Sequence, residues 1–149
     1  MPKYLEEFRV GESAEYGEHT ITEAEIVAFA NRYDPQRFHV DPGGAEASVH
    51  GGLIASGWHT TCLAMRMAVE HGYLRDAAVI AGVGVENLRW ERPVRPGDTL
   101  RVREEIVGVR PSESDPDRGV LTIEIRVFNQ DDREVLSMDW IDVVRRRNG

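Results

Sequence analysis

The chain has 149 residues, of which 41% are hydrophobic, and a formal net charge of −8. This length allows one domain with a real core, whereas two domains would each be small. The acidic balance, with no long run of like charges, argues against a nucleic-acid-binding surface. We therefore expect a single domain over residues 1–149.

The N-terminal segment MPKYLEEFRVGES places acidic residues where a signal peptide needs an apolar core. No stretch approaches the roughly 18 apolar residues of a membrane-spanning helix. The single cysteine, Cys62, excludes an intrachain disulfide and fits a reducing compartment. We expect a cytoplasmic protein that does not enter a membrane.

The first helical pattern follows a short N-terminal strand. Thr22 and Glu25 have the spacing of a capping box, and Ile26, Phe29 and Ala30 form a short apolar face at helical spacing. These signals predict a helix from about residue 22 to residue 33. Pro35 should end it, because the residue before a proline is disfavoured in helical geometry.

A second and longer helix is predicted in the segment GLIASGWHTTCLAMRMAVEHG, ending near Gly72. Its hydrophobic residues cover nearly the whole circumference of the helical wheel: Leu53, Ile54, Ala55, Trp58, Cys62, Leu63, Met65 and Met67. A helix that is apolar on all sides belongs inside a protein.

After this helix the hydrophobic period changes to that of strands. The four segments VIAGVGVENLRW, DTLRVREEIVGV, GVLTIEIRVFNQ and EVLSMDWIDVVR are rich in β-branched residues. The separators RPVRPGD, RPSESDPDRG and NQDDR have turn compositions, which should join neighbouring antiparallel strands. We expect an α+β fold in which an antiparallel sheet of about five strands wraps around one long buried helix.

The stretch YDPQRFHVDP, residues 33–42, lies between the two predicted helices. Asp34 could be only part of a helix stop, but a carboxylate and a histidine on a loop can also clamp and activate a water molecule. The next segment, VHGG, brings Gly51 and Gly52 to the expected start of the second helix. Free N–H groups there could stabilise an oxyanion.

Together these segments resemble a known family. The run from Tyr33 to His39, five more residues, Ala45, then HGG and an apolar helix is similar to the signature of MaoC-like dehydratases, also called (R)-specific enoyl-CoA hydratases. The segments GGLIASGWHT and ENLRWERPVRPGDTL extend the resemblance to about residues 18–110. It implies the single-helix hotdog fold.

The resemblance also implies a reaction. Asp34 and His39 would activate water for addition to a trans-2-enoyl thioester, and the Gly51 N–H would hold the thioester oxygen. Gln36 occupies the family's asparagine position, and His59 replaces a hydroxyl-bearing residue. The alternatives are a hotdog thioesterase and a non-catalytic subunit that binds acyl thioesters.

Further candidates for substrate binding surround this centre. Ser56 and His59 lie three residues apart on one helical face, so they could line a pocket or bond to a neighbouring strand. The arginines near PVRPG could bind coenzyme A phosphates or be solvated strand ends. We assign as substrate-binding Gly52, Ser56, His59, Arg89, Arg92 and Arg95.

Other histidines and tryptophans receive structural interpretations. His50 is expected to bond to backbone, and Trp58 and Trp90 are expected in the core or in subunit contacts. The five histidines lack the paired spacing of a zinc site, and no cofactor is expected besides coenzyme A as the carrier of the substrate. An uncovered sheet edge and the family resemblance both predict a homodimer or a multiple of it.

Overall fold

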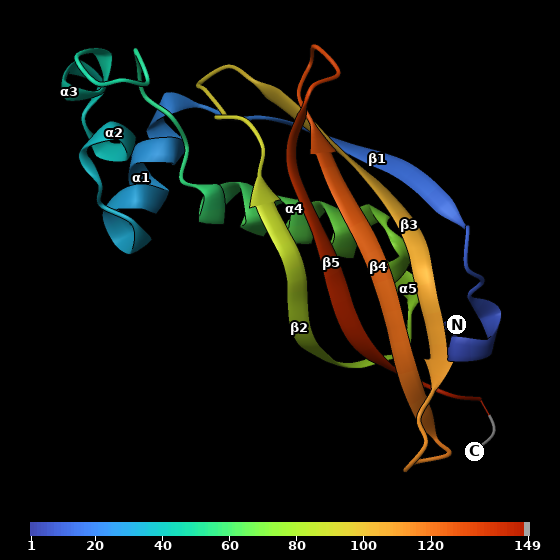
Figure 1. Ribbon diagram of the computed structural model, residues 1–149. Coiled ribbons are helices and arrows are strands. Elements are labelled where there is room, and N and C mark those ends of the chain that lie inside the picture. Colours follow the sequence, from blue (N-terminus) through green and yellow to red (C-terminus); the bar gives the residue numbers. More distant parts are fainter. Residues whose placement is uncertain (148–149) are drawn as a thin grey trace.

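A computed structural model describes residues 1–147. Five strands form one antiparallel sheet in the order β1-β3-β4-β5-β2, which curves around the central helix α4 (Figure 1). The strands are β1 (Ser13–Thr20), β2 (Val79–Trp90), β3 (Thr99–Pro111), β4 (Arg118–Phe128) and β5 (Glu134–Arg145). The helices are η1 (Leu5–Glu7), α1 (Glu23–Tyr33), α2 (Arg37–Val40), α3 (Pro42–Glu46), α4 (Gly57–His71) and α5 (Tyr73–Asp76).

The expected α+β architecture, with a five-stranded antiparallel sheet around a long helix, is therefore confirmed. None of the helices in residues 1–147 is long and apolar enough to cross a membrane.

The sheet connections agree with two of the three predicted turns. β3 joins β4 and β4 joins β5 as hairpins, but β2 pairs with β5 while β3 lies between β1 and β4. The prediction that RPVRPGD joins neighbouring strands is wrong. The end of this segment bonds to the other side of the sheet, because Gly97 N–H donates to Ile21 O and Ile21 N–H donates to Asp98 O, at 2.8 and 2.9 Å.

The core lies between α4 and the concave face of the sheet. Alternating residues of β4 are fully buried, as the period-two pattern predicts: Leu121, Ile123, Ile125 and Val127. Small residues of α4, Ala64 and Ala68, are also fully buried. Their size allows the helix backbone to approach the sheet closely.

α1 begins as its sequence predicts. Thr22 Oγ1 accepts from the Glu25 N–H at 3.2 Å, and the Glu25 carboxylate accepts from the Thr22 N–H at 2.8 Å. The helix ends at Tyr33, and the N–H of the C-cap residue Asp34 donates to Ala30 O. Asp34 is thereby fixed at the point where the chain leaves α1.

α4 begins later than predicted. The residues Leu53, Ile54 and Ala55 precede the helix, since the Ile54 N–H donates to Phe38 O and the Ala55 N–H donates to Val94 O. These long-range bonds hold the segment outside the helix. Gly51 and Gly52 therefore lie in the loop before α4, whereas the predicted end near Gly72 is confirmed.

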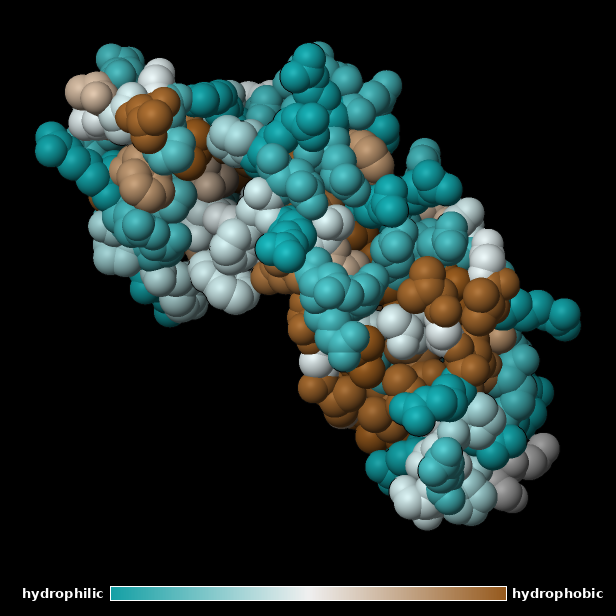
Figure 2. All heavy atoms as spheres, viewed as in Figure 1, coloured by the Kyte–Doolittle hydropathy of each residue, from teal (hydrophilic) through white to brown (hydrophobic). Residues whose placement is uncertain are grey.

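α4 is also not buried on its whole circumference. Four residues spaced along one side of the helix are exposed in the chain: Trp58, Cys62, Met65 and Val69. The edge strand β2 is likewise exposed along its length, including the hydrophobic residues Val79, Ile80, Val83 and Val85. Figure 2 shows hydrophobic side chains gathered over the lower part of the sheet face in this view.

The C-terminal end of α4 is anchored by a buried carboxylate on β3. Glu104 is fully buried; it accepts hydrogen bonds from the Tyr73 N–H at 2.6 Å and the Tyr16 hydroxyl at 2.8 Å. Burial raises the pKa of Glu104 above its usual value, although both hydrogen bonds act in the opposite direction. This carboxyl group ties β1, β3 and the α4–α5 junction together.

Candidate active site

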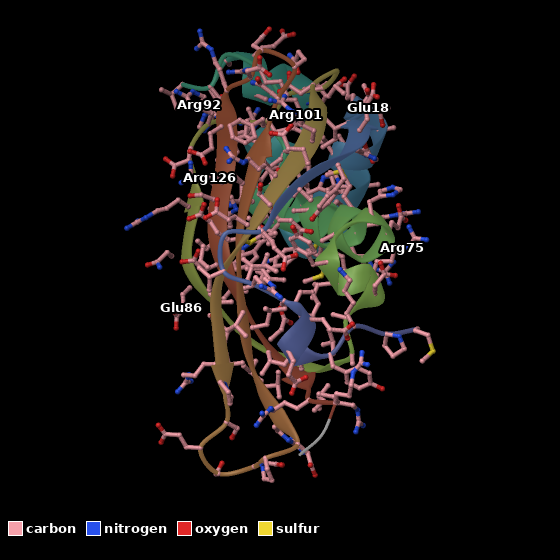
Figure 3. All side chains as sticks on the ribbon, turned by 90° about the vertical axis from the view of Figure 1, so that its right-hand side faces the viewer. Glu18, Arg75, Glu86, Arg92, Arg101 and Arg126 are labelled. Carbon is pink, nitrogen blue, oxygen red and sulfur yellow. The ribbon has the colours of Figure 1, made fainter. Side chains whose placement is uncertain are left out.

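A cavity of about 550 Å³ opens beside the first turn of α4. Figure 3 shows Arg92, one of the residues that line it, at the end of the sheet where α2 and α3 pack. The walls come from the loop after α1, the start of α4 and the end of β2. The lining residues include Tyr33, Asp34, Gln36, His39, His50, Gly57, Trp58, Thr60, Trp90 and Arg92.

The Asp34 carboxylate is held by two side chains. Gln36 Nε2 donates to Oδ1 at 2.8 Å, and the hydroxyl of the fully buried Ser56 donates to Oδ2 at 2.7 Å. Ser56 is also the N-cap residue of α4. The carboxylate is thus fixed between the end of α1 and the start of α4.

These contacts also set the charge of Asp34. Burial raises the pKa of its carboxyl, but the hydrogen bonds from Gln36 and Ser56 and the neighbouring His39 outweigh burial and hold the pKa below its usual value. Asp34 is therefore ionised at neutral pH and available as a hydrogen-bond acceptor.

His39 faces the same carboxylate from the buried side. Its Nε2 lies 3.3 Å from Asp34 Oδ2, and its Nδ1 lies 2.7 Å from Ile54 O. A carbonyl oxygen only accepts, so Nδ1 carries a proton toward Ile54 O and Nε2 is the ring nitrogen directed at Asp34. A water molecule in the cavity that contacts Asp34 Oδ2 is therefore also within reach of His39 Nε2.

Backbone donors of α4 complete the site. The first N–H groups of a helix have no partner within the helix, and Gly57 and Trp58, which supply them here, both line the cavity. The Gly51 N–H instead donates to Ser48 O at 3.1 Å. The helix N-terminal residues that line the cavity therefore begin at Gly57, six residues later than the Gly51 position that the sequence indicated.

Trp90, the last residue of β2, covers the start of α4. A Cβ atom on Gly57 would lie 2.4 Å from the Trp90 ring, so glycine is required for this contact. Trp90 Nε1 donates to Thr61 Oγ1 at 3.2 Å, and the ring meets Trp58 edge-to-face at 5.2 Å. Both tryptophans, interpreted from sequence as core or subunit contacts, form a wall of the cavity.

The remaining predicted residues are distributed differently. Arg92 lines the cavity, Arg95 donates to His50 O, and Arg89 lies on β2 away from the cavity lining. His50 also lines the cavity, and its ring packs against Phe38 at 4.9 Å.

Gly52 and His59 are not among the lining residues; His59 is buried between α4 and α1. Within residues 1–147, no group of three or more histidine, cysteine, aspartate or glutamate side chains is placed to hold a metal ion.

Sequence reasoning missed the link between Ser56 and Asp34. The Asp34 to His39 spacing was readable in the sequence, whereas a contact over 22 residues depends on how the α1–α4 loop folds. The hydroxyl that contacts the carboxylate comes from Ser56, not from the position of His59.

Comparison with known proteins agrees with this arrangement. Residues 7–126 match the model of the MaoC like domain. Protein MaoC of Klebsiella aerogenes is 38% identical over 102 residues, which cover 68% of this chain and 30% of that protein.

Two solved structures are similar over nearly the whole chain. The MaoC-like dehydratase from Rhodospirillum rubrum has a TM-score of 0.89 and 38% identity, with 99% of both chains covered. The R-hydratase PhaJ1 from Pseudomonas aeruginosa has a TM-score of 0.76 and 26% identity, covering 96% of this chain and 85% of that one. The expected hotdog fold is thereby confirmed, and the chain belongs to the MaoC-like domain family.

Proposed function

We propose that the chain is a hydro-lyase that reversibly adds water to a trans-2-enoyl thioester. The observation that carries this proposal is the convergence of Asp34, His39 and the start of α4 on one cavity. The names of similar proteins, a MaoC-like dehydratase and an R-hydratase, support the same reaction class.

In the proposed mechanism, one water molecule donates a hydrogen bond to Asp34 Oδ2 and contacts His39 Nε2. The water oxygen keeps a lone pair free to attack Cβ of the substrate. Asp34 takes a proton as the new C–O bond forms, and the π electrons of the alkene move through Cα onto the thioester oxygen. His39 holds the water in place, and the proton taken by Asp34 passes across the 3.3 Å contact to His39 Nε2, which delivers a proton to Cα. Water is thereby added overall.

The negative charge on the thioester oxygen needs donors that are already oriented. The N–H groups of Gly57 and Trp58 replace Gly51 in this role, because they begin a helix of 15 residues and line the cavity. A helix N-terminus favours negative charge, and loss of one such donor costs about 100- to 1,000-fold in rate in other enzymes.

The carrier of the acyl group is proposed to be coenzyme A or an acyl carrier protein, with no further cofactor. Arg92 is the best placed of the three predicted arginines, since it lines the cavity and is exposed. One of its nitrogens donates to Glu134 O at 2.8 Å, which leaves other guanidinium N–H groups for a phosphate.

A second copy is proposed to cover the exposed face of β2 and α4. An edge strand offers unpaired backbone groups, and this one carries hydrophobic residues that a monomer would leave in water. Antiparallel pairing of β2 with the same strand of a second copy would satisfy a two-fold axis. The row of exposed apolar residues on α4 is proposed to pack in the same interface.

The test of the reaction is a set of variants of the two side chains that contact the proposed water. Asp34→Asn keeps the size of the side chain but removes its basicity, so kcat should fall by at least about 100-fold. His39→Gln should give a similar loss. The double variant should lose little more than either single variant, because both groups act on one water.

The assay follows the absorbance of the conjugated enoyl thioester for short and medium trans-2-enoyl-CoA substrates, with a thiol reagent in parallel. Asp41→Asn is the matched control, since Asp41 lies in the same segment but pairs with Arg37 outside the cavity. Release of free thiol as the main product would identify a thioesterase. Unchanged hydration by Asp34→Asn would refute the proposed reaction. So would binding of the enoyl thioesters without hydration of any of them.

A further inference from the structure

His59 occupies a position that the proposed reaction does not explain. It lies in the first turn of α4, is 5% exposed and does not line the cavity. Its ring stacks on Phe29 of α1, with centroids 4.5 Å apart and planes inclined by only 6°. Within residues 1–147 its buried Nδ1 has no hydrogen-bond partner. The ring therefore contributes contact area instead of a hydrogen bond at this nitrogen.

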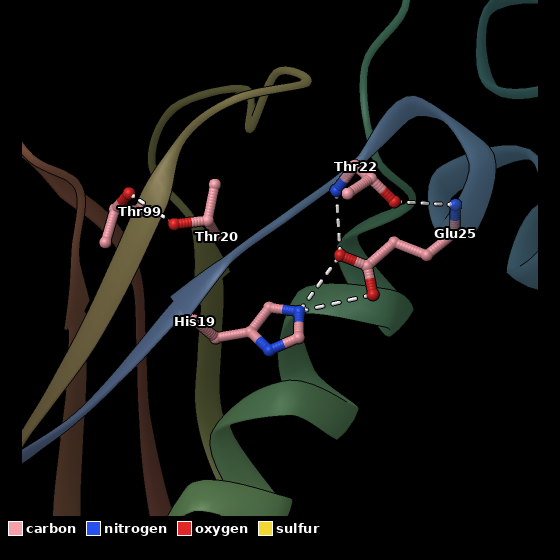
Figure 4. A network of polar contacts seen from close by, with 5 residues as sticks. All are labelled: His19, Thr20, Thr22, Glu25 and Thr99. Atoms are coloured by element: carbon pink, nitrogen blue, oxygen red, sulfur yellow. Dashed lines mark hydrogen bonds and ion pairs between the residues drawn. The ribbon is translucent and has the colours of Figure 1, made fainter.

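The surroundings of His59 favour a neutral ring. Burial lowers its pKa below the usual value; nearby Glu25 acts in the opposite direction and nearby His19 in the same one. Figure 4 shows that Glu25 is already engaged, since it accepts from the Thr22 N–H and contacts His19 Nε2 at 2.9 Å. The carboxylate whose charge acts on His59 is thus already bonded to other groups.

Histidines contact α1 at its beginning, middle and end. His19 pairs with Glu25 in the first turn, His59 stacks on Phe29 in the middle, and His39 faces Asp34 at the C-cap. The last contact belongs to the candidate active site, and the first fixes α1 to β1. Only the middle contact of these three joins α1 to α4, the helix whose N-cap residue also bonds to Asp34.

We propose that His59 is a positioning residue, which fixes α1 against α4 through the Phe29 ring so that Asp34 stays bonded to Ser56. The His19–Glu25 pair holds the first turn of α1 against β1, and the single hydrogen bond between Ser56 and Asp34 does not by itself fix the rest of α1 against α4. The stacking of His59 on Phe29 supplies a second contact between the two helices. His59 lies three residues after Ser56, and Phe29 lies five residues before Asp34. The catalytic role of Asp34 rests on the proposed function, but its fixed geometry does not.

The experiment compares His59→Phe, which keeps a flat ring without nitrogen, with His59→Ala, which removes the ring. The first readout is the pKa of the Asp34 carboxyl, measured by carbon-13 NMR titration. His59→Ala should raise this pKa above that of the parent chain, because the Ser56 hydrogen bond that lowers it is lost. His59→Phe should leave it unchanged.

The second readout is turnover of an enoyl-CoA substrate. Misplacement of a catalytic group by about 1 Å can cost about 100-fold, so kcat of His59→Ala should fall by about 10- to 100-fold with little change in KM. His59→Phe should stay within about threefold of the parent chain. Met67→Ala is the matched control, because it truncates another buried side chain of α4 two turns further along. It should reduce stability without changing the Asp34 pKa.

The proposal is overturned if His59→Ala leaves the Asp34 pKa unchanged, or if His59→Phe behaves like His59→Ala. The latter result would assign the role to a ring nitrogen. Because the NMR readout needs no substrate, it decides the positioning role even if the chain does not hydrate enoyl thioesters. Inactivity of the parent chain would count against the proposed function alone.

Discussion

Replacement of Asp142 by asparagine should stabilise the fold at neutral pH. Asp142 lies on β5 beside Gly82 of β2 and Leu121 of β4, is 6% exposed, and its Oδ2 has no hydrogen-bond partner within residues 1–147. A Cβ atom on Gly82 would lie 3.3 Å from Oδ1, so the glycine provides the space for this carboxyl. Burial raises the pKa of Asp142 to about 6. Above this pH a buried, ionised carboxylate therefore lowers the stability of the fold.

The size and direction of the effect follow from linkage. The usual pKa of 3.8 applies to the unfolded chain, so between about pH 4 and pH 6 the folded state binds more protons. The free energy of unfolding therefore falls as pH rises through this window and stays reduced above it. The difference between the two pKa values corresponds to at most about 3 kcal/mol. Asp142→Asn should add up to about this much at pH 8 and almost nothing below pH 4.

Urea unfolding at fixed protein concentration, repeated from pH 4 to pH 8, measures this difference. Asp139→Asn is the control, because it removes the same charge from β5 at a site where the carboxylate accepts from Asn87 at 2.9 Å. An equal gain in the control would assign the effect to net charge. If Asp142→Asn gains nothing at pH 8, or gains equally at pH 4, the argument from burial is refuted.

Gly57→Ala should cost about 1 to 3 kcal/mol of stability and alter the near-ultraviolet circular dichroism of tryptophan, because the new methyl group overlaps the Trp90 ring; an unchanged spectrum with full stability would contradict the contact. Ser56→Ala should raise the pKa of Asp34 and lower kcat by about tenfold or more, as measured by NMR titration and the hydration assay, since it removes one of the bonds that hold the carboxylate. Light scattering should show a dimer or a multiple of it, and Cys62, exposed in the single chain, should react more slowly with a thiol reagent as protein concentration rises through the dissociation constant; a monomer at all concentrations would refute the proposed interface.

Local signals in the sequence predicted local structure well. The Thr22 and Glu25 capping box and Pro35 delimited α1, because both act within one helical turn. The start of α4 was misplaced because LIAS is apolar like the helix that follows. Its N–H and carbonyl groups bond to Phe38, Val94 and His39, which no local pattern can indicate. The prediction that β2 and β3 are neighbours was wrong for the same reason, since turn composition does not reveal which strands pair.

In the candidate site, too, local features could be predicted from the sequence and long-range contacts could not. Asp34 and His39 could be paired from their spacing and from the family resemblance. Ser56, Trp58 and Trp90 joined the site only when distant segments were brought together by the fold. Asp142 did carry a signal in the sequence: it alternates with Trp140 and Val144 along β5, so the pattern already places a carboxylate on the buried face.

The anchoring of α4 at its far end has a consequence for engineering. Glu104 fastens the C-terminal end of the helix to β1 and β3, while the residues that line the cavity lie at the opposite end. Substitutions near His50, which lines the cavity, therefore leave the hydrogen bonds of Glu104 in place. A library at His50 and its exposed neighbours, with the fully buried Ala45 kept, would vary one side of the cavity while the far end of the helix stays anchored.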